Sequence, residues 1–123
     1  MDVSNVAPDL DVLVDEWLTL PKAAERLGEL PGRVRQLIRD GRLIAVRGGE
    51  PREPRIPAAF VADGVVVKGL PGTLTLLRDA GYDDAAALRW LFTPQESLPG
   101  APIQALVENR GTEVKRRAQA LAF

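Results

Sequence analysis

Two short helical patterns lie next to each other in the first third of the chain. The first, PKAAERLG, places Ala23, Ala24 and Leu27 on one apolar face and closes on a glycine. Thr19 suits the cap of this helix, and the proline that follows is tolerated in the first turn. Because alanines are small, a second helix can approach this face closely.

The second pattern begins at Pro31, where Val34, Leu37 and Ile38 recur at the spacing of a single buried stripe, and Gly41 ends it. Successive residues of a helix are about 100° apart, so the opposite side and the flanks are polar. This outward face carries the side chains of Arg33, Arg35, Gln36 and Arg39.

An extended pattern follows the second helix. RLIAV is rich in strand-forming residues, RGGEPREP is a charged turn, and RIP resumes an extended segment. We predict a two-stranded wing, with Arg47, Arg52 and Arg55 in and beside its loop.

The second half of the chain shows four helical segments with short connections. Pro71 and Pro102 suit the starts of two of them, Asp83 or Asp84 caps another, and Thr112 caps the last. The two adjacent aspartates are therefore read as caps and given no catalytic role. The expected fold is mainly α with a small β wing: a winged helix-turn-helix at residues 18–63, followed by a C-terminal helical bundle at residues 64–123.

Composition excludes several functional classes. The chain has no cysteine and no histidine, which removes the usual structural zinc sites, thiol nucleophiles and histidine acid/base pairs. It also lacks a phosphate-binding glycine fingerprint, so we expect no enzyme activity, no catalytic residue, no cofactor and no metal. No apolar run approaches the roughly 20 residues of a membrane span. A cytoplasmic, nucleoid-associated protein with no membrane contact is the expectation.

The formal net charge of -1 hides an uneven distribution. Residues 1–19 hold five acidic side chains and no basic one, whereas residues 20–62 hold nine basic side chains against five acidic ones. Residues 1–17 are expected to be an acidic, flexible tail, loose up to about Leu13. Such a tail could compete with phosphate for the basic region, and phosphorylation of Ser4 would add to its charge.

Two short helices joined by a tight turn, with basic residues on the second, form a helix-turn-helix pattern. Arginine and glutamine make paired hydrogen bonds to guanine and adenine edges, and a helix fits the major groove of double-stranded DNA. Sequence-specific DNA binding by a transcriptional or nucleoid regulator is therefore the favoured function. The expected DNA-binding residues are Lys22, Arg33, Arg35, Gln36, Arg39, Arg42, Arg47, Arg52 and Arg55.

The stretch LTLPKAAERLGELPGRVRQLIRDGRLIAVRGG, with RIP after it, resembles the winged helix-turn-helix of the excisionase and MerR-like group. From Leu18 onward the chain is similar to a small actinobacterial family of DNA-binding regulatory proteins, most specifically in LRWLFTP and RRAQALAF. One mycobacterial member is known as a protein-kinase substrate, so the resemblance implies a Ser/Thr protein kinase as a partner. In one departure, Glu29 and Leu30 stand where such turns commonly have an apolar residue and a Ser or Thr cap.

A protein-interaction adaptor is the alternative function. The segment DDAAALRWLFTPQESLPGAPIQAL loosely resembles the C-terminal domain of Xre/ParS-type antitoxins, which binds a toxin or forms a dimer. In that case the C-terminal helices would hold a homodimer or another protein, and the basic module would only be a scaffold. An exposed patch containing Trp90 and Phe92 would favour the adaptor.

Overall fold

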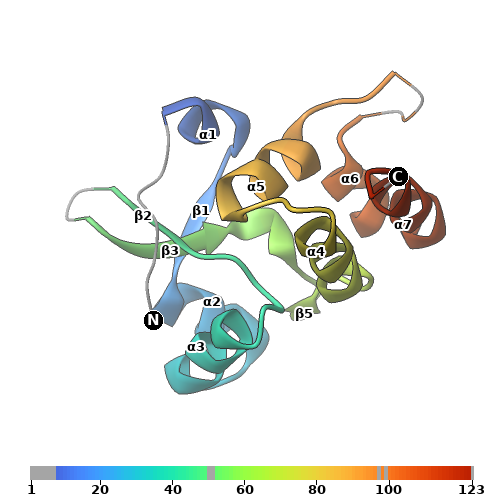
Figure 1. Ribbon diagram of the computed structural model, residues 1–123. Coiled ribbons are helices and arrows are strands. Elements are labelled where there is room, and N and C mark those ends of the chain that lie inside the picture. The colour runs from blue at the N-terminus through green and yellow to red at the C-terminus, as the bar shows by residue number, and fades with distance from the viewer. Residues whose placement is uncertain (1–7, 50–51, 97, 99, 123) are drawn as a thin grey trace.

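The computed structural model describes residues 8–49, 52–96, 98 and 100–122. Figure 1 shows the N-terminal elements and a small sheet on one side of the molecule, and the C-terminal helices on the other. The N-terminal elements are α1 (Pro8–Leu13), β1 (Trp17–Thr19), α2 (Leu20–Leu27), α3 (Pro31–Arg39), β2 (Val46–Gly48), β3 (Glu53–Pro57) and the 3-10 helix η1 (Ala58–Phe60). They are followed by β4 (Val61–Ala62), β5 (Val65–Val66), α4 (Leu70–Asp79), α5 (Asp84–Phe92), α6 (Pro102–Val107) and α7 (Gly111–Ala120). The predicted fold class is confirmed.

The first predicted helix, α2, has the expected ends. The backbone N–H of Lys22 donates a hydrogen bond of 3.3 Å to the hydroxyl of Thr19, which is the N-cap. Gly28 closes the helix at φ 66°, in the left-handed region that favours glycine. Both signals are local in sequence, and the prediction from them is confirmed.

The second predicted helix, α3, begins at Pro31 although its cap is unusual. Leu30 is the N-cap residue and provides no side-chain hydrogen bond, and its own side chain is 77% exposed. Val34 and Leu37 are buried and Ile38 is half-buried, as the predicted stripe requires. The burial of this stripe, together with the proline in the first turn, sets the helix without a Ser or Thr cap.

The wing belongs to a sheet of three strands, in the order β1-β3-β2, with both pairs antiparallel. The prediction of two strands was therefore incomplete, because β1 pairs with β3 and places Leu18 opposite Ile56. The predicted first strand was also too early. Residues 43–45 are buried in succession, whereas a half-buried strand would alternate, and regular pairing begins only at Val46.

Residues 8–13 form helix α1, so the expectation of a loose chain up to about Leu13 is wrong for this segment. Leu10 is completely buried and Val14 is 2% exposed. The carboxylate of Asp9 accepts hydrogen bonds of 2.6 and 3.1 Å from Arg89 on α5, which holds α1 against that helix. The acidic side chain of Asp9 therefore meets α5 and not the basic face of α3. Residues 1–7, including Ser4, lie outside the described part of the chain.

The ion pair between Asp9 and Arg89 predicts a pH dependence of α1 docking. Hydrogen bonding and charge attraction from Arg89 lower the pKa of Asp9 below its ordinary value. Because the folded-state pKa is the lower one, this contact stabilises α1 above the ordinary aspartate pKa, and the stabilisation is lost as the pH falls through the lowered value. An NMR titration of Asp9 should show the lowered pKa, and Arg89→Ala should return it toward normal. An unchanged titration in that variant would contradict the pairing.

The predicted cap residues of the C-terminal helices need one correction. The carboxylate of Asp83 accepts a hydrogen bond of 2.8 Å from the backbone N–H of Ala86, so this aspartate is the cap of α5. Thr112 was predicted to cap α7 but lies inside its first turn, because the N-cap is Arg110. Asn109, which follows the C-cap of α6, takes a left-handed conformation at φ 65°. The chain turns there, and α7 begins at Gly111, before Thr112.

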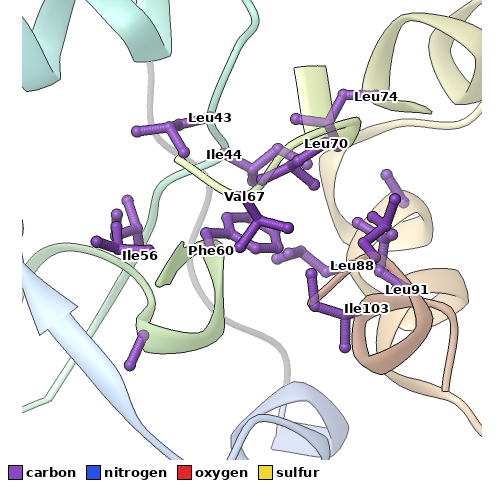
Figure 2. Packing of buried hydrophobic residues seen from close by; sticks show 14 of the residues in the cluster. Leu43, Ile44, Ile56, Phe60, Val67, Leu70, Leu74, Leu88, Leu91 and Ile103 are labelled. Atoms are coloured by element: carbon purple, nitrogen blue, oxygen red, sulfur yellow. The ribbon is translucent and has the colours of Figure 1, made fainter. Parts of the chain in front are cut away.

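The two halves share one hydrophobic core. Phe60 is completely buried, and Figure 2 shows its ring between side chains from the sheet half, such as Ile56, and side chains from the helical half, such as Leu88 and Ile103. Its ring centre lies 5.9 Å from that of Phe92. A polar contact also joins the halves, since Arg78 of α4 donates a hydrogen bond of 2.7 Å to the carbonyl of Gly41, just after α3.

Candidate nucleic-acid interface

The outward face of α3 carries all four polar side chains predicted for it. Arg33, Arg35, Gln36 and Arg39 are all exposed. A guanidinium nitrogen of Arg33 donates a hydrogen bond of 3.3 Å to the amide oxygen of Gln36, one turn further on. The exposed side of the helix therefore carries three cations and one amide.

Helix α2 supports α3 from behind. Ala23 and Ala24 are buried, and their small side chains let the two helices pack closely. Lys22 stands on the exposed side of α2, 3.6 Å from the carboxylate of Glu25. Because both partners of this surface pair are well exposed, the pair contributes little to stability. Lys22 remains accessible to a phosphate beside α3.

Two of the three predicted wing arginines are accessible. Arg52 is exposed in the loop region and Arg47 is half-buried on β2. Both lie on the hairpin that β2 and β3 form, where Arg47 is opposite Pro54. The wing therefore carries Arg52 exposed and Arg47 half-buried.

Arg55 is different, although it was predicted as a DNA contact. Its guanidinium lies 2.5 Å from the carboxylate of Asp11 and 4.6 Å from the ring centre of Trp17, and its side chain is only 16% exposed. The guanidinium thus joins α1 to the sheet through an ion pair and a cation–π contact. We therefore leave Arg55 out of the interface proposed below.

Arg42 extends the basic face beyond the end of α3. Arg42 and Arg33 both line a cleft of about 270 Å³, whose other walls include Leu37 on α3 and Pro71 on α4. The turn that carries Arg42 is held in place by the hydrogen bond from Arg78 to Gly41. The basic face therefore borders the start of α4.

The cations of this face differ in their pairing from the other arginines of the N-terminal half. Arg26 pairs with Glu16 at 3.3 Å, and Arg55 pairs with Asp11. The following arginines, by contrast, have no carboxylate within 4.0 Å among the described residues: Arg33, Arg35, Arg39, Arg42, Arg47 and Arg52. Their charges are available to an anionic partner.

The described residues also bear on the expectations of no metal site and no membrane-spanning helix. They contain no cluster of acidic, histidine or cysteine side chains able to hold a metal ion, and no helix long and apolar enough to cross a membrane. A larger cleft, of about 460 Å³, lies between Leu13, Ala58 and Phe92, and its basic residue Arg26 is paired with Glu16.

The described surface also lacks the exposed patch of Trp90 and Phe92 that would favour a protein-interaction adaptor. Trp90 and Phe92 are both partly buried and pack against the hydrophobic core. Phe92 is held by the buried ring of Phe60. These aromatic side chains are therefore parts of the core.

Comparison with known proteins agrees with this geometry. Residues 5–61 match the protein-family model described as the wHTH domain of the DNA-binding protein Rv2175c, and residues 67–122 match the model described as the Rv2175c C-terminal domain of unknown function. The chain is 44% identical to the DNA-binding protein Rv2175c of Mycobacterium tuberculosis, covering 98% of this chain and 92% of that protein.

A solved structure supports the same relationship. The NMR structure of Rv2175c superposes on this fold with a TM-score of 0.81 and 38% sequence identity, over 100% of this chain and 90% of the other. The resemblance to an actinobacterial family of DNA-binding proteins is thereby confirmed. This chain belongs to the Rv2175c family, with a winged helix-turn-helix domain followed by the C-terminal domain of that family.

Proposed function

We propose that this protein binds double-stranded DNA in a sequence-specific manner, with α3 in the major groove, and acts as a transcriptional or nucleoid regulator. The observation that carries the proposal is the exposed face of α3, with one glutamine and three arginines that have no carboxylate partner among the described residues. In this arrangement Arg33, Arg35, Gln36 and Arg39 reach base edges, where arginine recognises guanine and glutamine recognises adenine. The phosphate contacts come from Lys22, Arg42, Arg47 and Arg52.

Two further observations support this proposal. The family model matched by residues 5–61 is that of a DNA-binding winged helix-turn-helix. The arginines of α3, of the following turn and of the wing that lack a carboxylate partner among the described residues all fall within the matched segment 5–61. We place the division between the two domains near residues 63 and 64, within the β4–β5 hairpin that falls between the two family matches.

The regulatory role has consequences for partners and location. A single recognition helix reads only a few base pairs, so we propose that two copies act together on one DNA site in the cytoplasm, at the nucleoid. We place the contact between the two copies on the C-terminal helices. A Ser/Thr kinase acting on the N-terminal residues fits the same role, although Ser4 lies outside the described residues.

Selection of bound sequences from random double-stranded DNA tests the proposed function. We expect enrichment of a defined sequence, and an inverted repeat if two copies bind together. The affinity should also fall steeply with salt, with a slope of about 0.9 per phosphate contact in a plot of log affinity against log salt. Recovery of unenriched DNA together with a flat salt dependence would exclude the proposal.

A pair of wing variants separates DNA contact from structural support. Arg52→Ala should weaken binding to all DNA sequences about equally and reduce the salt slope by about 0.9, because a phosphate contact carries no sequence information. Arg55→Ala is the matched control, since it removes the same charge from the same hairpin but breaks contacts with Asp11 and Trp17. It should lower the melting temperature and leave the salt slope unchanged. If Arg55→Ala instead reduces the salt slope and Arg52→Ala lowers the melting temperature, the proposed roles of the two arginines are exchanged.

A further inference from the structure

Three exposed cations of the C-terminal half have no ion-pair partner among the described residues. Lys68 lies just before α4, and Lys115 and Arg116 are adjacent on α7. The acidic residue of α7, Glu113, is instead engaged by Arg110 at 2.7 Å and by Arg117 at 3.9 Å. The carboxylate nearest in sequence to Lys115 and Arg116 therefore does not neutralise them, and this part of α7 is positively charged.

One of these three cations, Lys115, lies over the first turn of α4, and that turn also borders the cleft beside α3. The side chain of Lys115 lies over α4, and its Cε would be 3.3 Å from a Cβ placed on Gly72. Gly72 directly follows Pro71, which lines the same cleft as Arg33 and Arg42. The first turn of α4 thus borders both the cleft beside α3 and the side chain of Lys115 on α7.

The arrangement of the elements is consistent with one extended surface. In Figure 1, α3 lies at the lower edge of the molecule, with the wing toward the left and α4 and then α7 toward the right. Helices α4 and α7 pack against each other directly. A long anionic partner that covers α3 can therefore extend in two directions, toward the wing or toward α7.

We infer that the C-terminal domain takes part in DNA binding, with Lys68, Lys115 and Arg116 contacting the phosphate backbone of the duplex held by α3. This inference rests on the proposed function. The favoured occupant is DNA because Lys115 lies over the turn of α4 that borders the proposed DNA interface. The three cations also have no ion-pair partner among the described residues, as is the case for the arginines of α3. Contacts of this kind raise affinity without reading sequence, because every base pair presents the same phosphates.

The test compares single substitutions in the full-length protein on a long duplex of random sequence. Lys115→Ala and Arg116→Ala should each reduce the salt slope by about 0.9 between about 50 and 200 mM salt. Together they should weaken binding roughly tenfold or more at about 0.1 M salt. Lys115→Arg retains the charge and should restore the slope. The sequence selected from random DNA should be the same for all variants.

Arg26→Ala is the matched control, because it also removes one exposed cation but one that is paired with Glu16. Its salt slope should equal that of the wild type. Unchanged slopes for Lys115→Ala and Arg116→Ala, alongside a reduced slope for Arg52→Ala, would overturn the inference and leave the proposed function standing. Failure of the wild type to bind any duplex would instead overturn the proposed function. Thermal melting of each variant should match the wild type, since both side chains are exposed.

Discussion

Replacing both Arg35 and Arg39 with alanine is expected to weaken binding of the selected DNA site by about 2–6 kcal/mol, because each paired hydrogen-bond contact to a base is worth about 1–3 kcal/mol. This loss corresponds to a decrease in affinity of at least roughly 30-fold. Both side chains are exposed on α3 and have no carboxylate partner among the described residues. Their removal leaves the buried stripe of the helix intact. The loss should therefore appear in DNA affinity and not in the melting temperature.

Comparing binding to the selected site with binding to random DNA separates a base contact from a phosphate contact. Arg39→Ala alone should reduce the preference for the selected site, because loss of a base contact weakens the specific complex more than the nonspecific one. Arg52→Ala should weaken both complexes to a similar extent. Gel-shift titrations with the two duplexes measure both effects, and Arg26→Ala again serves as the charge-matched control. If Arg35 and Arg39 can be removed without loss of binding, α3 does not face the DNA.

Phe60→Ala is expected to have the largest effect on stability, a loss of about 3–5 kcal/mol in the free energy of unfolding. Small domains have a total stability of only about 5–15 kcal/mol, so this is a large share. Phe60 is completely buried and lies between the sheet half and the C-terminal helices. Its removal leaves a cavity lined by both halves, and we expect Ile56 and Leu88 to lose contacts together.

Chemical denaturation followed by tryptophan fluorescence and by circular dichroism measures this effect. Because the core is one cluster, the two signals should give a single shared transition in the wild type and a transition at lower denaturant in Phe60→Ala. Val65→Ala is the control, since that side chain is 59% exposed and its truncation should change stability by less than about 0.5 kcal/mol. Two separate transitions in the wild type would show that the halves unfold independently.

Much of the candidate interface could be predicted because its signals are local. The stripe of Val34, Leu37 and Ile38 determines which side of α3 is buried, and the arginines then face outward by helical geometry alone. The caps at Thr19 and Asp83 are likewise contacts within three residues along the chain. Even the missing cap at Leu30 did not displace the helix, because burial of the stripe outweighs one capping hydrogen bond.

The missed features depend on partners that are distant in sequence. Helix α1 is short and acidic, so its own residues give a weak helical signal, and only the spacing of Leu10 and Val14 could have indicated a buried face. Strand β1 is three residues long and is defined by pairing with β3, almost 40 positions later. No local pattern reveals such a pairing.

Arg55 shows the same limit within the predicted site. Its sequence neighbours are those of a wing arginine, yet its carboxylate partner, Asp11, is 44 residues away. Arg52, only three residues earlier, remains exposed. The difference between an arginine held within the protein and one left exposed was therefore decided by how α1 folds back onto the sheet.

By itself, the sequence determined the helix-turn-helix, the orientation of α3 and the identity of its outward side chains, since helical periodicity and capping act over a few residues. Only the tertiary structure decided which cations are neutralised within the protein and which are left for a partner. It also brought Lys115 of α7 over the first turn of α4, which borders the cleft that Arg33 and Arg42 line. Ion pairing and surface continuity depend on distances in space, which chain folding sets and sequence spacing does not.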